Sequence, residues 1–394
     1  MTKPRIKLTK KSIICICCAL IIIVIATVLI LYFNRSEDNA EKLSWKEVSE
    51  LAEVPENKYS NITFAENCVL ILPDVDTFYQ YQLTADLTKE ETLQLCYDVG
   101  EVVFPGIFSK ESQVFDDSKM RADVTFSTDE LSYRSSVYAY GKMVIYNEQG
   151  IESAFFGTPE KIIRLSRGDS TENEAYTVNG ESYMVSDALA LAEETVKKLE
   201  PYMDGFIYKP TDVIVIKDKS TDNYSYHIQF EAIIDSVPIN DGGKVAVNDG
   251  TSKYFITDTC LYVTISSPGI VAEVYRSRGV DFTDKEELKD EFITLEAATE
   301  KLAEYYAPYY KTTVSEISVK YAIKREYGTE EHTIHPYWCF IIDYPVNLVL
   351  EDTYCMGENT IYVDMVTGEV ISYFRDAGQF ISSFEKQEST DETE

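Results

Sequence analysis

The chain has 394 residues, and its content of 45% hydrophobic and 12% aromatic residues excludes an intrinsically disordered protein, because it supplies enough apolar surface for folded cores. Its formal net charge of −31 excludes sequence-independent nucleic-acid binding, since so acidic a surface neutralises no phosphates. The length is sufficient for two or three domains.

An unbroken apolar run at residues 13–33 separates a basic tail, residues 1–12, from an acidic remainder. A helix of this length covers a hydrocarbon core of roughly 30 Å, and the charge asymmetry is the positive-inside pattern. No small-residue cleavage site follows the run, which argues against a secretory signal peptide. We therefore predict a cytoplasmic tail, a transmembrane helix that anchors the chain in the lipid bilayer, and extracytoplasmic domains after it.

Residues 34–57 are predicted to be a juxtamembrane connector with one short helix, because Ser44-Trp45-Lys46-Glu47 has the pattern of a capping box. Trp45 either lies at the lipid interface or packs on the first domain. That first α+β domain is predicted over residues 58–176. A second capping box, Thr88–Glu91, begins its helix, and short strands separated by turn residues follow.

The second and third domains, residues 180–282 and 290–382, look like copies of one plan. Each begins with a helix whose apolar residues recur at i, i+3 and i+4, over 187–199 and 295–306, and antiparallel strands follow. Pro residues end both helices. Residues 383–394 are predicted to be a disordered acidic tail.

Short motifs also recur between these two domains. Leu-Tyr-Val at 261–263 is matched by Ile-Tyr-Val at 361–363, which indicates a duplication with a period of about 100 residues. In the third domain the run Tyr362-Val-Asp-Met-Val-Thr-Gly-Glu-Val370 predicts a hairpin with a turn through Val366–Gly368.

The third domain resembles the PepSY and Yyc regulatory-protein families. The matching residues are Leu295-Glu-Ala-Ala-Thr-Glu-Lys-Leu302, Pro336-Tyr-Trp-Cys-Phe340 and the Tyr362–Val370 run. The second domain departs from the pattern, because Thr264 and Ser267-Pro-Gly269 replace the Asp and the Thr-Gly. The resemblance implies envelope proteins of mainly Gram-positive bacteria, built of cystatin-like modules, that inhibit peptidases or tune a membrane sensor kinase. It brings no catalytic residues.

Taken together, these patterns predict an α+β fold: an N-terminal transmembrane helix followed by tandem helix-on-antiparallel-sheet domains of the cystatin or PepSY type. We assign no catalytic, cofactor-binding or metal-binding residues and expect no cofactor.

The histidines give a weak metal signal. His332 and His335 lie among acidic residues, but a His-x-x-His followed by Pro cannot place both imidazoles on one face of a regular helix. We interpret this segment as a polar loop between strands and His227 as a strand residue. Asp218-x-Ser220-x-Asp222 is not a calcium loop, because Asn223 stands where the pattern requires Gly.

Five cysteines follow the apolar run, and none has Cys-x-x-Cys spacing. Cys339 and Cys355 are the best candidates for a disulfide, although free buried thiols fit the sequence equally well. No Cys/His signature of a nucleophile is present.

The sequence therefore predicts a non-enzymatic, membrane-anchored extracytoplasmic protein that binds or regulates a partner. The partner would be an envelope or membrane protein of the sensor-kinase or peptidase type, or a cell-wall component. The Tyr-rich strands 337–344 and 360–365 are expected to dock it. Two alternatives stay open: a metal-dependent envelope hydrolase using His332 and His335, and a structural spacer.

Overall fold

The structure is a computed structural model, and from Leu43 onward its residues belong to one compact unit. It describes residues 42–83, 87–104, 109–127, 132–147, 157–165, 168–203, 206–239, 254–257, 260–277, 282–289, 292–306, 312–326, 332–342 and 359–371.

The described chain is mostly β, so the predicted α+β class with a transmembrane helix is wrong. The helices that the capping boxes and periodicity indicated are short. The strands pair with partners far away in the sequence and form one large sheet with both parallel and antiparallel pairs. Within the described ranges no helix is long and apolar enough to cross a membrane. The segments 1–12, 13–33 and 383–394 lie outside the described residues. The prediction of a single-pass membrane protein with extracytoplasmic domains is therefore wrong for the part of the chain that the structure describes.

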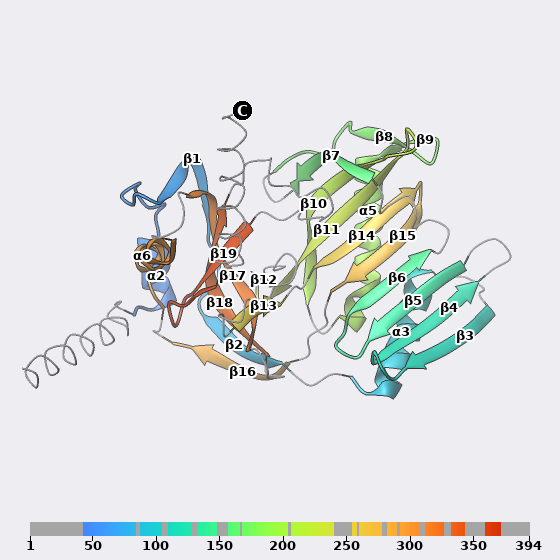
Figure 1. Cartoon of the computed structure of the whole chain (residues 1–394), viewed down its shortest axis with the longest axis horizontal. Helices are drawn as coiled ribbons and strands as arrows, with labels where there is room; N and C mark the ends of the chain where they lie inside the picture. The colour runs from blue at the N-terminus through green and yellow to red at the C-terminus, as the bar shows by residue number, and fades with distance from the viewer. Residues whose placement is uncertain are drawn as a thin grey trace, which may run out of the picture. The chain divides into compact units, whose positions relative to one another are not determined.

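Nine of the described strands form a continuous antiparallel sheet in the order β3-β4-β5-β6-β15-β14-β11-β10-β7 (Figure 1). Their bounds are β3 (Ser109–Asp116), β4 (Arg121–Ser127), β5 (Ser132–Tyr138), β6 (Met143–Asn147), β7 (Gly157–Arg164), β10 (Ile207–Asp218), β11 (Tyr224–Ile234), β14 (Leu261–Ser267) and β15 (Ile270–Arg276). We call it the nine-stranded sheet. The pairing of β6 with β15 runs across the predicted boundary between the first domain, 58–176, and the second, 180–282.

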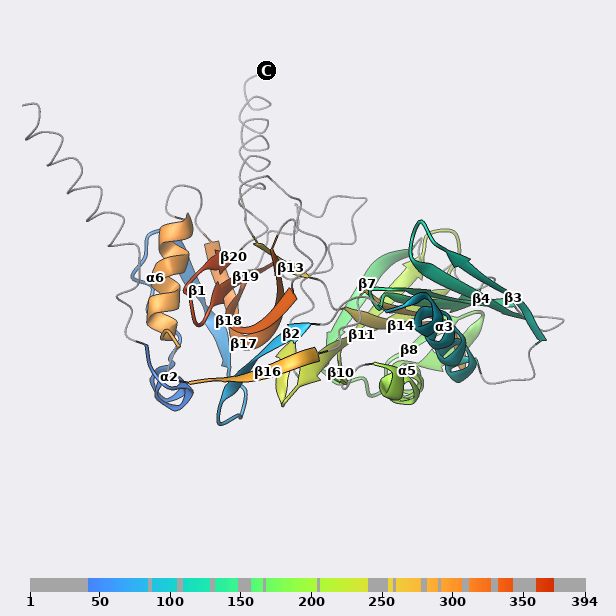
Figure 2. The ribbon, with the colours of Figure 1, turned by 90° about the horizontal axis from the view of Figure 1, so that it is seen from below.

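Two helices, α3 (Lys89–Val103) and α5 (Val185–Leu199), cover one face of this sheet (Figure 2). The predicted capping box at the start of α3 is confirmed, since the Glu91 carboxylate accepts a hydrogen bond from the Thr88 backbone N–H at 2.8 Å. α5 starts two residues before the predicted position and presents an apolar stripe to the sheet, including Ala188, Ala192 and Val196.

Gly100 lets α3 approach β4 and β5 closely. A Cβ at this position would lie 2.8 Å from Cζ of Phe126 and 3.1 Å from Cβ of Ser135. We expect Gly100→Ala to lower the free energy of unfolding by about 1–3 kcal/mol, because the overpacking outweighs the gain of about 1 kcal/mol in helix propensity. Urea denaturation checks this, with Gln94→Ala on the exposed side of α3 as control. A Gly100→Ala variant more stable than the wild type would contradict it.

The remaining strands surround a long hairpin of β17 and β18. Their bounds are β1 (Ile62–Ile71), β2 (Phe78–Leu83), β12 (Val237–Ile239), β13 (Tyr254–Thr257), β16 (Phe282–Leu288), β17 (Thr312–Glu326), β18 (His332–Ile342), β19 (Asn359–Asp364) and β20 (Val370–Ile371). β1 pairs in parallel with the first half of β17, and β19 pairs antiparallel with β18. β2 pairs with both β16 and β18. β12 pairs with β11 and with β17. Strands from the start and the end of the chain therefore share one group. A separate hairpin is formed by β8 (Ala175–Val178) and β9 (Glu181–Met184).

The connector helix is α2 (Trp45–Leu51), and its predicted capping box is confirmed, because Ser44 N–H donates to Oε2 of Glu47 at 3.0 Å. Trp45 is buried, and its ring lies edge-on to Phe78 with centroids 4.8 Å apart. Of the two placements expected for Trp45, the structure therefore has it packed in the folded unit.

In the described parts of the Tyr-rich strands 337–344 and 360–365, no aromatic ring is exposed for docking. Tyr337, Trp338 and Tyr362 are all buried, and Trp338 donates its indole N–H to the carbonyl of Ile293 at 3.1 Å, just before α6 (Leu295–Tyr306). The expectation is wrong because these rings are buried: Tyr337 and Tyr362 pack in a cluster with Ala322 and Cys339, and Trp338 lies on the opposite face of β18.

The run Tyr362–Val370, on which the family resemblance rests, forms the turn between β19 and β20, as its turn residues predict. Oδ1 of Asp364 accepts hydrogen bonds from the backbone of Val366 at 2.9 Å and of Thr367 at 3.0 Å. Gly368 has a φ of 72°, and Glu369 pairs with Lys324 at 2.6 Å. Asp364, Thr367 and Gly368 of the motif thus have structural roles in the turn.

Candidate functional site

The face of the nine-stranded sheet opposite α3 and α5, which we call the open face, gathers polar and aromatic side chains. The register pairs His227 with Thr264, Thr264 with Glu273, Glu273 with Tyr146, and Tyr146 with Arg134. Directly paired residues lie on the same face of a sheet. These five residues therefore form one row across β11, β14, β15, β6 and β5. None of the described helices packs on this face.

Aromatic rings continue beside this row. The rings of Tyr262 and Tyr275 stack with centroids 4.8 Å apart and planes 10° apart, and the His227 ring lies 4.0 Å from Tyr262. The ammonium group of Lys142 lies 5.2 Å from the Tyr275 ring and 5.4 Å from the Tyr138 ring. All four rings are half-buried, so each keeps an accessible part on the open face.

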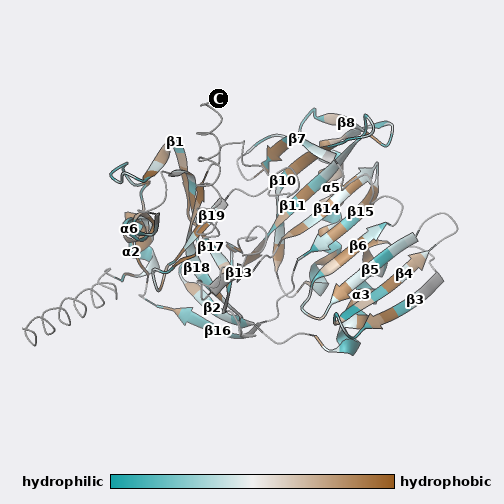
Figure 3. Ribbon diagram, viewed as in Figure 1, coloured by the Kyte–Doolittle hydropathy of each residue, from teal (hydrophilic) through white to brown (hydrophobic). Residues whose placement is uncertain are grey.

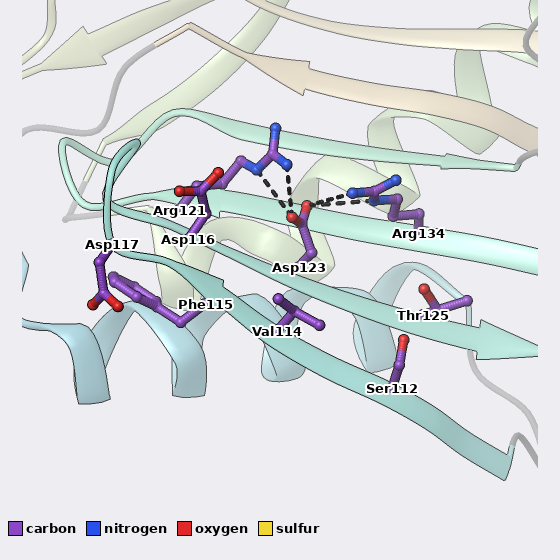
Figure 4. A pocket seen from close by; sticks show the side chains of 9 residues that line it. All are labelled: Ser112, Val114, Phe115, Asp116, Asp117, Arg121, Asp123, Thr125 and Arg134. Carbon is purple, nitrogen blue, oxygen red and sulfur yellow. Dashed lines mark hydrogen bonds and ion pairs between the residues drawn. The ribbon is translucent and has the colours of Figure 1, made fainter.

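A charged cluster occupies the other end of the face (Figure 4). Asp123 accepts hydrogen bonds from Arg121, whose Nη2 lies at 2.8 Å, and from Arg134, whose Nη2 lies at 3.2 Å. Ser136 donates its hydroxyl to the same carboxylate at 2.6 Å. Figure 4 shows the two guanidinium groups approaching Asp123 from opposite sides. Two guanidinium groups therefore share one carboxylate here, while the nearby Asp116 and Asp117 pair with Lys119 at 3.7 Å and Lys89 at 3.1 Å.

These residues form the floor of an open depression of about 600 Å³. The edge strand β3 supplies its rim, with Ser112, Val114 and Asp116 paired in register with Thr125, Asp123 and Arg121 of β4. The Arg121 and Arg134 side chains are 21% and 34% exposed, so both guanidinium groups are held in place and still reachable from solvent. A surface of this kind suits recognition of a carboxylate or another acceptor group.

Glu273 is a buried acid in the middle of the open face. It is 2% exposed, and its carboxyl group makes no hydrogen bond or ion pair within the described part of the chain. Burial raises the pKa of Glu273 to about 8. The group is therefore mostly protonated and neutral at pH 7.

The predicted polar loop around His332 and His335 is wrong, because both residues belong to β18 and pair with β17. Positions three apart in a strand belong to opposite faces, so the two do not combine into one ligand set. Burial lowers the pKa of His335, against the opposing effect of Asp364. No group of three or more His, Cys, Asp or Glu suited to a metal occurs among the described residues.

The other predicted positions have structural roles. His227 is a half-buried strand residue, as expected, and burial lowers its pKa to about 4. Asp218 accepts hydrogen bonds from the backbone N–H and the hydroxyl of Ser220, at 2.6 and 2.7 Å. These bonds are typical of a turn. Cys339 is a free buried thiol, which is the second of the two alternatives for the cysteines, and Cys355 lies outside the described residues.

Sequence reasoning missed the residues of the open face. The signal was partly present locally: Arg121-x-Asp123-x-Thr125 alternates with the apolar residues Ala122 and Val124, whereas Arg134-x-Ser136-x-Tyr138 is interrupted by the polar Ser135. Two such runs joined by a short turn place their polar residues side by side on one face. The contribution of β14 and β15 to the same face had no local signal.

Comparisons with known proteins find a similar fold but give no function for the open face. No protein-family model and no curated protein matches the chain. A crystal structure of an uncharacterized protein from Eubacterium rectale ATCC 33656 is similar, with a TM-score of 0.52 and 13% identity over 80% of this chain and 91% of that one. The C-terminal domain of Bacillus megaterium YpeB matches with a TM-score of 0.33 and 12% identity, over 73% of this chain and 99% of that domain. At 13% identity, the first similarity is one of fold alone.

Proposed function

We propose that this chain is a non-enzymatic binding protein that docks a partner protein on the open face. The composition of that face carries the proposal, because Tyr and Arg are enriched at the energetic centres of protein interfaces. The half-buried side chains concerned are Arg121, Arg134, Tyr138, Tyr146, Tyr262 and Tyr275.

The arginines are arranged for binding rather than for stability alone. Asp123 fixes both guanidinium groups before a partner arrives, so little side-chain entropy is lost on contact. Their guanidinium groups remain partly exposed, and they favour an Asp or Glu of the partner at this end of the face. The stacked rings of Tyr262 and Tyr275 offer rigid apolar area beside it.

The resemblance of the third domain to the PepSY and Yyc regulatory proteins supports regulation as the purpose of docking. On that analogy the partner is a protein of the sensor-kinase or peptidase type. A structural spacer is the competing function, and it requires no partner on the open face.

Site-specific photo-crosslinking in the producing cells tests the proposal. A photoreactive phenylalanine analogue is placed singly at Tyr146 or Tyr262 on the open face. The control position is Tyr202, a half-buried tyrosine in the short 3-10 helix Glu200–Tyr202 at the end of α5. We expect illumination to give a heavier adduct from both open-face positions and none from Tyr202.

The adduct also identifies the partner by mass spectrometry. Adducts of equal yield from all three positions indicate nonspecific contact and contradict the proposal. Their absence from both open-face positions, in a chain that folds normally, supports the spacer instead.

A further inference from the structure

β1 is an edge strand with one described partner. It pairs in parallel with β17, Val69 opposite Glu316, Leu70 opposite Ile317 and Ile71 opposite Ser318 (Figure 1). Within the described ranges no strand pairs with its other side. That side therefore presents backbone N–H and C=O groups that another strand can bond.

The second half of β1 lacks the usual protection of a sheet edge. Residues Asn67–Ile71 carry no charge and no proline, and Val69 and Ile71 are 49% and 42% exposed. The register shift in the pairing with β17 ends at Val69, so the strand is regular from there on. Uncharged, regular and apolar edges are the ones that accept a further strand.

Three other edge strands carry such protection. β7 carries Pro159, Glu160 and Lys161. β3 has a register shift after Lys110, and β16 contains the run Asp284-Lys-Glu-Glu287, drawn mostly in teal in Figure 3. Charges, prolines and bulges are the devices by which proteins block edge pairing. β1 has a register shift of its own between Phe64 and Val69, and the short strand β13 is also uncharged, so β1 is distinguished by the exposure of Val69 and Ile71 after the shift.

The surroundings of this edge are acidic. Glu66 precedes the apolar residues, and Asp74 and Asp76 follow the strand, all three exposed. Glu316 on β17 lies opposite Val69, and it adds to burial in raising the pKa of the Cys68 thiol to about 11. The edge is thus an apolar strip bounded by negative charge at both ends.

We propose that the free side of β1, from Asn67 to Ile71, accepts an extended segment of a partner protein as an added strand. The segment is apolar at alternate positions, to contact Val69 and Ile71, and basic at both ends, to meet the acidic surroundings. This docking edge is separate from the open face and does not depend on it.

Binding of two synthetic peptides to the full chain tests the proposal. The first is fluorescein-labelled Lys-Lys-Val-Thr-Val-Thr-Val-Lys-Lys, and the second replaces all four Lys by Glu. Fluorescence anisotropy at low salt should show the Lys peptide binding at least about tenfold more tightly. Amide hydrogen exchange at residues 67–71 should slow on binding, because an added strand bonds the free backbone groups.

The matched variants are Val69→Lys in β1 and Ile207→Lys in β10, two residues that are 49% and 57% exposed. We expect Val69→Lys to weaken binding of the Lys peptide at least about tenfold and Ile207→Lys to leave its affinity within about twofold. Replacing the central Val of the peptide by Pro should also abolish binding, since proline cannot donate to the ladder.

Three results would overturn the proposal. One is equal affinity for the Lys and Glu peptides. Another is protection from exchange at sites other than 67–71 in the wild-type chain, a readout that does not depend on any variant folding. The third is concentration-dependent self-association that Val69→Lys abolishes, which would make a second copy of this chain the occupant.

Discussion

Replacing Trp338 by alanine is expected to lower the free energy of unfolding by about 3–5 kcal/mol, a large part of the stability of an ordinary domain. The indole is fully buried in the hairpin of β17 and β18, and its N–H bonds the carbonyl of Ile293 at 3.1 Å. Truncation leaves a cavity and an unpaired buried carbonyl together. Urea denaturation followed by circular dichroism measures the loss.

The control for this variant is Val114→Ala, whose side chain is 56% exposed and should change stability by no more than about 0.5 kcal/mol. Trp338→Phe should fall between the two, because it keeps most of the ring volume and loses the hydrogen bond. A loss below about 1 kcal/mol for Trp338→Ala would mean that this side chain is not buried in the core.

The second large effect is a dependence of stability on pH through Glu273. Burial raises its pKa in the folded state from 4.5 to about 8, so between these values the folded chain holds a proton that the unfolded chain releases. The contribution of this group to stability is fully present below about pH 4.5 and declines as the pH rises through about 8. Because one pKa unit corresponds to about 1.4 kcal/mol, the total decline is on the order of 5 kcal/mol.

Glu273→Gln keeps the size of the side chain and remains neutral, so it should remove most of this decline. Urea denaturation at pH 5 and pH 9 is the measurement, and the variant should exceed the wild type in stability at pH 9 while matching it at pH 5. Glu286→Gln in β16, an exposed position, serves as the control and should follow the wild-type curve. Parallel curves for Glu273→Gln and the wild type would show that Glu273 is not buried.

Local chemistry made several elements predictable. The capping boxes at Ser44 and Thr88 begin the helices that they indicated, because their hydrogen bonds span only three residues. The turn at Asp364–Glu369 likewise depends on neighbouring residues alone. These predictions needed no knowledge of the rest of the chain.

Long-range pairing was not predictable from the same signals. Alternation identifies a strand but not its partner, and β1 pairs with residues some 250 positions later. The join of β6 to β15, which unites the open face, is a contact of this kind. Nor does alternation say which face a helix covers, so Trp338 and Tyr362 were expected on the surface and lie in the core.

The affinity of the crosslinked partner for variants of the open face tests the central claim most directly. Arg134→Gln leaves Asp123 paired with Arg121, and Tyr262→Ala removes one ring of the stacked pair, so both variants should fold. Calorimetric titration should show each binding the partner at least about 30-fold more weakly than the wild type, with Tyr202→Ala unchanged. Affinities within about threefold of the wild type for both variants would contradict docking on the open face.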